Sequence, residues 1–463
     1  MTPVRRVAPT LAVLVVAALG FAACVVADWP GHFPPDAIDQ LAQGRSGVFD
    51  FWHPPVMAWL LGLADRVVAG APLFFVIDAA LFFAALAAMA LVRGTGWWAV
   101  PVTAAISASP LALIYQGLVV KDVLFADASL AGFAALAWAA RLWPRRPARL
   151  ALSALALALF TLAALARQNG AIVAGAGALT LAWVDLAKAG REAAPRAALR
   201  FAVAAAAGLA SMGLVGGLAA LEFRAHSDRE PTAARQWMSL QIYDLAGALR
   251  RDPGLALPVL HRADPATERF VRREAAPKFD PTRIDPMYQL GNWDRVLKHP
   301  TPWVGAQWRQ LISTAPGLYL AVRSEALRQV FLTPDIPACA AVLVGVDPGN
   351  PAMLRRAGLT ARETDKDDWD GDYAAAFLGT PVFSHAAYAV VALAMLVLAI
   401  RDLVRRQAVE MIATVGMLVA VLAFTASFFV ISLACDYRYL YFLDVAAMAA
   451  LAQRAALWRR TMS

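Results

Sequence analysis

Two aspartates at the edges of apolar segments could carry out chemistry in this sequence. Asp36 lies in PDAIDQ, shortly after the first apolar segment, and Asp122 lies in VVKDVLFAD, at the start of a later one. An ionised carboxylate at such a position can take the proton of an attacking hydroxyl group. Asp39 follows Asp36 by three residues and could share or replace its role.

Basic side chains stand beside the same segments. His53 precedes a Pro-Pro step, Lys121 precedes Asp122, Arg167 lies in ARQNG and Arg438 lies in CDYRYLYF. A departing phosphate is stabilised by positive charge and needs no proton donor, whereas glycoside hydrolysis uses two carboxyl groups. One carboxylate with several cations therefore favours transfer from a sugar phosphate over hydrolysis.

The chain that must position these groups is very apolar. Of its 463 residues, 60% are hydrophobic and 16% are charged, against roughly 45–50% apolar residues in soluble domains. Apolar runs long enough to cross a membrane recur along it, which predicts an all-α protein with many spans. The net charge of +8 comes mostly from arginines that flank these runs, so we expect membrane lipids and no nucleic acid as partners.

A membrane helix needs about 20 residues, and by this measure we predict ten spans. They are 7–27, 73–92, 97–116, 123–140, 150–166, 170–187, 201–221, 383–400, 408–432 and 437–453. Arginine and lysine concentrate in the loops on one side, so the positive-inside rule places both termini in the cytoplasm. The first segment could be a signal peptide, but with many spans following we expect an uncleaved helix.

This pattern divides the chain into three parts. Residues 1–221 form an N-terminal transmembrane module whose first outer loop, 28–72, contains Asp36, and residues 383–463 supply the last spans. Residues 222–382 are polar and rich in proline, which predicts a large outer insertion above a cavity that opens outward.

Two smaller features belong to the outer side. Residues 54–69 are apolar, begin with two prolines and contain Asp65 and Arg66, so we expect an amphipathic helix on the outer surface. Three cysteines rule out a disulfide framework, although one bridge between Cys339 and Cys435 is conceivable.

The order of these motifs resembles the GT-C class of integral-membrane glycosyltransferases, in the family 39 branch that includes lipid A aminoarabinose transferases and protein O-mannosyltransferases. Asp36 matches the acid of the first outer loop, HPPVMAW (53–59) matches the proline step after it, and KDVLFADASL (121–130) matches the second acid. The resemblance covers residues 1–190 and, beyond them, mainly RYLYF. Ala37 and His53 depart from the glutamate and the lysine that the family often has there.

The resemblance implies a GT-C-like helical bundle. It would move a sugar, with inversion, from a polyprenyl-phosphate donor to a hydroxyl of a lipid, glycan or protein at the outer face of a bacterial inner membrane. Asp36 would be the base, with Asp39 sharing or replacing it and Asp122 supporting the site. The expected donor-binding residues are His53, Lys121, Arg167 and Arg438. We expect no cofactor and no metal; the alternative is a divalent ion held by Asp36, Asp39, Asp122 and His53.

Simpler roles and other functions stay open at this point. Asp36 and Asp122 could each cap the helix that follows, and Arg167 and Arg438 could serve only as ion-pair partners of Asp122, Asp436 or Asp444. The chain could be a transporter or flippase for a lipid-linked substrate, with charges through the depth of the membrane. It could also be an O-antigen polymerase or ligase, which would use arginines of the large outer loop.

Overall fold

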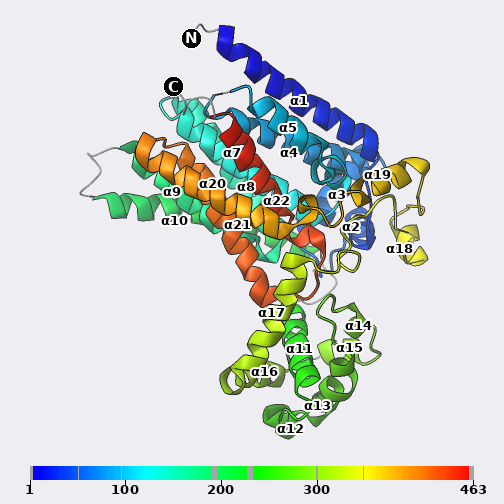
Figure 1. The fold of residues 1–463 in the computed structure, drawn as a ribbon. Helices are drawn as coiled ribbons and strands as arrows, with labels where there is room; N and C mark the ends of the chain where they lie inside the picture. The colour runs from blue at the N-terminus through cyan, green and yellow to red at the C-terminus, as the bar shows by residue number, and fades with distance from the viewer. Residues whose placement is uncertain are drawn as a thin grey trace.

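The computed structural model describes residues 4–50, 52–94, 96–189, 196–226, 233–298, 301–347 and 349–457. Throughout these ranges the regular elements are helices (Figure 1), and β pairing is limited to isolated bridges. Eight of the described helices are long and apolar enough to cross a membrane. The prediction of an all-α, multi-span membrane protein is therefore confirmed.

The eight candidate spans match eight of the ten predicted segments. They are α1 (Val4–Asp28, apolar from Val7), α4 (Pro72–Leu91), α7 (Lys121–Arg141), α8 (Arg146–Ala166), α9 (Ala171–Ala189), α10 (Ala197–Ala225), α20 (His385–Arg406) and α21 (Met411–Ile431).

The other two predicted spans are irregular, so the count of ten is not confirmed. The segment 97–116 is broken into α5 (Ala99–Ala108) and α6 (Pro110–Leu113), followed by η1 (Tyr115–Gly117), with a bend of 71°. The segment 437–453 begins with η7 (Tyr437–Leu440), which leaves 15 residues for α22 (Tyr441–Ala455), fewer than the roughly 17–25 of a membrane helix.

Helix α7 lies at the centre of the bundle. Of its most apolar window, 94% is buried, and α4, α8, α21 and α22 pack around it. Its many alanines, and Gly132 against the ring of Phe160, let the neighbouring helices approach closely. The first turn of α7, with Lys121 and Asp122, is therefore surrounded by protein.

Two short helices lie in the segment between α1 and α4. Helices α2 (Pro35–Ser46) and α3 (Pro55–Val67) each begin at a proline, which suits the first helical position. They cross at Gly44 and Gly62, where a Cβ atom on either residue would collide with the backbone of the other helix. Helix α3 matches the amphipathic helix predicted over 54–69, and the tight crossing fixes the orientation of α2.

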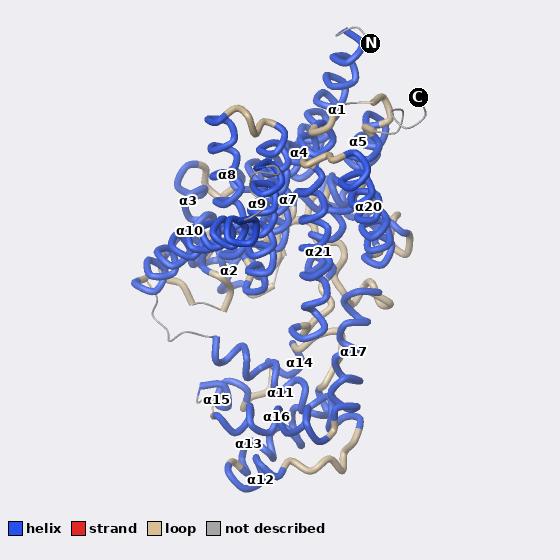
Figure 2. The backbone as a smooth tube through the Cα atoms, turned by 90° about the vertical axis from the view of Figure 1, so that its left-hand side faces the viewer, coloured by secondary structure: helices blue, strands red, loops and turns tan. Residues whose placement is uncertain are grey.

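The segment between α10 and α20 contributes to two hydrophobic cores. One group of its helices has a core of its own and lies at the end of the molecule away from both termini (Figures 1 and 2). It comprises α11 (Ala233–Arg251), α12 (Pro258–Ala263), α13 (Pro265–Phe270), η4 (Val271–Ala275), η5 (Ala276–Lys278), α14 (Asp285–Tyr288), α15 (Trp293–Lys298), α16 (Pro302–Thr314) and most of α17 (Pro316–Leu332).

The rest of that segment packs on the main bundle. Helices α18 (Pro351–Arg356) and α19 (Asp365–Ala375) contribute Leu354 and Ala374 to the main core, and η6 (Pro381–Phe383) leads into α20. The predicted insertion, 222–382, is thus shared between the helical group from α11 to α17 and the bundle itself.

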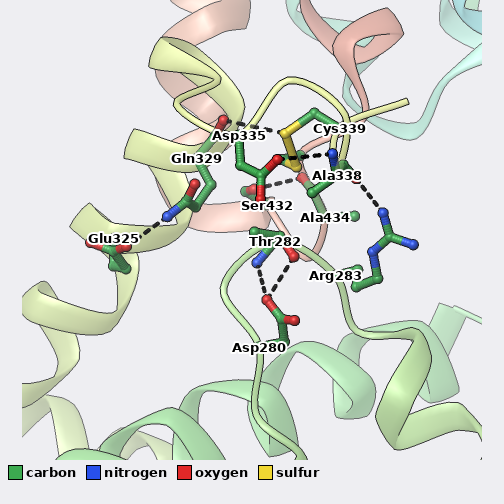
Figure 3. The surroundings of a disulfide bond; sticks show 11 residues. Asp280, Thr282, Arg283, Glu325, Gln329, Asp335, Ala338, Cys339, Ser432 and Ala434 are labelled. Atoms are coloured by element: carbon green, nitrogen blue, oxygen red, sulfur yellow. Dashed lines mark hydrogen bonds between the residues drawn. A yellow bond between two sulfur atoms is a disulfide. The ribbon is translucent and has the colours of Figure 1, made fainter. Parts of the chain in front are cut away.

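A disulfide between Cys339 and Cys435 joins the loop after α17 to the loop before η7 (Figure 3). The backbone N–H of Cys435 donates to the carbonyl of Thr282, and that of Tyr437 donates to the carbonyl of Cys339. These bonds, together with the disulfide, hold the short segment that carries Arg438.

The predicted orientation can be tested with two single cysteines. Ser46 and Arg146 are both exposed, at opposite ends of the predicted spans. In intact cells, Ser46→Cys should react with a membrane-impermeant maleimide, and Arg146→Cys should react only after permeabilisation. Cys24 is buried and Cys339 is bridged to Cys435, so background labelling should be low. The reverse labelling pattern would contradict the cytoplasmic termini.

Candidate functional site

Asp36 lies in the first turn of α2, but it does not cap the helix. The N-cap residue is Pro34, so the capping role considered for Asp36 is wrong. Its Oδ2 accepts a 2.7 Å hydrogen bond from Nη2 of Arg438, and its Oδ1 lies 3.6 Å from Nε2 of His53. The side chain is 33% exposed, so its carboxylate is accessible from outside the protein.

Asp122 lies in the first turn of α7 and is buried. The N-cap residue there is Val120, so the capping role is wrong for this aspartate too. Arg167, directly after α8, donates a hydrogen bond to Oδ1 of Asp122. Nε of Arg438 lies 3.6 Å from Oδ2. The two guanidinium groups supply the positive charge that a buried carboxylate requires.

Arg438 joins the two aspartates into one cluster. Its guanidinium contacts Asp36 and Asp122, and it also donates a 2.8 Å hydrogen bond to Asp436. A planar guanidinium with five N–H donors can serve three carboxylates at once, whereas an ammonium group is a single point charge. Both arginines thus also make the ion pairs considered for them.

Lys121 and His53 complete the cluster. Nζ of Lys121 lies 2.6 Å from Nδ1 of His53. Because the ammonium group donates, Nδ1 accepts and the hydrogen of a neutral His53 ring stands on Nε2, facing Asp36. In this arrangement Nδ1 of His53 is engaged by Lys121, and Lys121 and Arg167 are the cationic side chains that line the neighbouring cavity.

Asp39 lies near enough to His53 and Asp36 to interact with their charges, but it forms its hydrogen bond elsewhere. Its Oδ2 accepts a 2.6 Å hydrogen bond from Nε2 of Gln43, one turn further along α2. The structure therefore gathers six of the seven predicted residues and leaves Asp39 outside. Asp436, which the sequence analysis considered only as an ion-pair partner, belongs to the cluster; its place two residues before Arg438 was the available signal.

The pKa values of the two candidate bases, Asp36 and Asp39, are shifted in opposite directions. Burial alone would raise the pKa of Asp36, but the charge of Arg438 and the hydrogen bond of His53 lower it well below its usual range. For Asp39, burial raises the pKa, and the hydrogen bond from Gln43 offsets this only in part. Burial also raises the pKa of Asp436, against the opposing effect of Arg438.

A cavity of about 520 Å³ opens beside the cluster, between the bundle and the helical group from α11 to α17. Its volume is within the range of small-molecule sites, roughly 300–1,000 Å³. His53, Lys121 and Arg167 bring polar and charged atoms to its wall. The rest of the wall is mostly aromatic, amide and aliphatic, including Trp52, Gln168, Asn169, Gln236, Trp237, Tyr288, Phe428, Ile431, Leu433 and Tyr439.

The position of Arg167 is fixed from several sides. Its guanidinium carbon lies 5.3–5.9 Å from the ring centroids of Phe125, Phe424, Phe428 and Tyr439. Aromatic faces attract a cation, and Asp122 neutralises it from a further side. A fixed positive charge at the cavity wall can stabilise an anion without costly rearrangement.

Comparison of the chain with protein-family models, with curated proteins and with solved structures finds no match. The interpretation of the site consequently depends on its own geometry.

Proposed function

We propose that this protein is an inverting glycosyltransferase with a GT-C-like bundle that uses a polyprenyl-phosphate sugar as donor. The supporting observation is the cluster in which Arg438 joins Asp36 to Asp122 beside a cavity lined by Lys121 and Arg167. A carboxylate and fixed cations at one place are what transfer from a sugar phosphate requires.

The reaction would be a single displacement. The acceptor oxygen attacks C1 of the sugar while its proton passes to the carboxylate of Asp36. The bond between C1 and the phosphate oxygen breaks, and its electron pair stays with the polyprenyl phosphate that leaves. Because attack and departure take place on opposite faces of C1, the configuration inverts.

The other residues would stabilise the charges and hold their positions. Lys121 and Arg167 would bind the phosphate, whose negative charge grows as it leaves. Asp122 would keep Arg167 and Arg438 in place, and His53 would connect Lys121 to Asp36. Phe428, Ile431 and Leu433 give the cavity an apolar side, which suits the prenyl chain of the donor. The acceptor would be a hydroxyl of a lipid, glycan or protein on the outer side of a bacterial inner membrane.

The direct test is turnover of a labelled donor. The purified chain is reconstituted in liposomes with a panel of radiolabelled polyprenyl-phosphate sugars and with lipid, glycan and protein acceptors from bacterial envelopes. We expect label to enter an acceptor as an equal amount of polyprenyl phosphate is released. Movement of labelled donor across the bilayer without transfer would favour a flippase instead, and an inert donor throughout the panel would contradict the proposal.

The dependence of kcat/KM on pH should show which aspartate is the base. A base works only when ionised, so the rate falls as the pH drops below its pKa. With Asp36 as base, kcat/KM should stay high down to a pH below the usual aspartate pKa of about 3.9. With Asp39, whose pKa is raised, the fall should begin above that value. The profile of Asp39→Asn, with folding checked at each pH, should match the wild type; a lost or shifted acid limb would assign the base to Asp39.

A further inference from the structure

A second cluster of ligand-type side chains lies outside the proposed transfer site. Asp28 ends α1, His32 follows four residues later in the non-helical segment before α2, and Asp370 lies in α19. Each of the three offers one ligand atom, these atoms lie within 4.8 Å of one another, and all three side chains are buried. Segments that are distant in the sequence therefore point nitrogen and oxygen atoms at one place.

The two buried carboxylates of this cluster repel each other, and the nearby His32 and Lys366 offset this only in part. Asp28 accepts 3.2 Å hydrogen bonds from Nε2 of His32 and from Sγ of Cys24. Asp370 is fully buried, and neither of its carboxylate oxygens has a hydrogen-bond partner within the part of the chain that the structure describes. Buried polar groups in native proteins are almost always satisfied, so a bare buried carboxylate next to another calls for a positive ligand.

We propose that Asp28, Asp370 and Nε2 of His32 bind a zinc ion. Two carboxylates balance the charge of a divalent cation when the imidazole is neutral. One nitrogen and two oxygen ligands from the protein, with the fourth position left for water, is a donor set that zinc accepts. Magnesium and calcium prefer oxygen ligands alone, so the histidine favours zinc over them.

The neighbours of His32 would let its ring proton move from Nε2 to Nδ1 when zinc binds. The N–H of Gly345 donates to Nδ1 at 2.9 Å, so in the structure the ring hydrogen stands on Nε2 and faces Asp28. Zinc would take the place of that hydrogen, and Nδ1 would then carry it. Oδ1 of Asp367 lies 3.6 Å from Nδ1 and can accept it, as carboxylates behind zinc-bound histidines do. The N–H of Gly345 would have to turn away.

The ion would connect two segments of the protein, residues 28–32 and α19. His32 also lines a cavity of about 250 Å³ beside Arg362 and Glu363. Zinc would link the end of α1 to α19. The end of α1 lies shortly before α2, the helix that carries Asp36. The proposed role is structural, so it is independent of the transfer reaction.

The test measures metal content and thermal stability of the full chain. The protein is purified in detergent without a polyhistidine tag, stripped with a chelator, exposed to zinc and freed of excess metal. We expect about one zinc ion per chain to remain bound and the unfolding temperature to be higher with zinc than without.

Two variants of α19 make the test specific. Asp370→Asn should lose both the zinc and the thermal shift, whereas Asp372→Asn, an exposed position in the same helix, should keep both. Asp370→Asn removes a buried unpaired charge, so without zinc it should be at least as stable as the wild type, and misfolding would not account for its loss of zinc. A wild type that retains no zinc, or an Asp370→Asn variant that retains as much as Asp372→Asn, would overturn the proposal.

Discussion

Asp36→Asn should lower the rate of sugar transfer by about 10²–10⁴-fold, the usual contribution of a general base. The asparagine has the size of the aspartate and its amide oxygen can still accept the hydrogen bond from Arg438, but it cannot take a proton from the acceptor. Asp36 is one-third exposed, so the variant should fold normally. The measurement is kcat/KM in the liposome assay with labelled donor, alongside the unfolding temperature.

Asp39→Asn is the matched control for this experiment. It makes the same chemical change one turn further along α2, at a side chain that bonds Gln43 instead of Arg438. We expect its activity to stay within a few-fold of the wild type, since Asp39 bonds Gln43 and is not one of the carboxylates that Arg438 contacts. Equal losses in both variants would indicate a general effect on α2, and a loss confined to Asp39→Asn would move the base to that residue.

The sequence was enough to predict the spans wherever hydrophobicity alone decides the structure. It did not predict the irregular shape of 97–116, which is bent by 71°, or the short helix within 437–453. Pro110 has no backbone N–H and breaks the first of these segments after Ser109. In the second, the segment from the Cys435 disulfide enters the bundle as η7, and the helix that follows is short. Hydropathy averaged over a window does not register either effect.

The candidate site was predictable as far as the motifs extend. The order of the acid loop, the Pro-Pro helix and the acid at the start of α7 indicated Asp36 and Asp122, and the cations came from the ends of spans. The exclusion of Asp39 was not predictable, because it depends on how the Gly44–Gly62 crossing rotates α2. The cluster proposed to bind zinc could not be predicted for a similar reason, since Asp370 meets Asp28 only through the packing of α19 on α1.

We expect the largest change in stability when Arg438, which joins the carboxylates of the candidate site, is replaced. Arg438 is 11% exposed and contacts Asp36, Asp122 and Asp436, of which Asp122 is fully buried. Removal of one partner from a buried ion pair typically costs about 3–5 kcal/mol, because the other charge is left uncompensated. Arg438→Gln should therefore lower the free energy of unfolding in detergent by about that amount and abolish transfer. Arg66→Gln, an exposed position in the same outer loop, should change it by no more than about 0.5 kcal/mol.

A double variant separates loss of charge balance from loss of packing. If repulsion among the remaining carboxylates causes the destabilisation, Asp436→Asn added to Arg438→Gln should recover part of the lost stability, since one uncompensated charge is gone. Transfer should not recover, because Asp36 and Asp122 would still lack the group that joins them. If Arg438→Gln unfolds like Arg66→Gln, the guanidinium does not hold the cluster together, and Asp36 and Asp122 would then act, if at all, as separate groups.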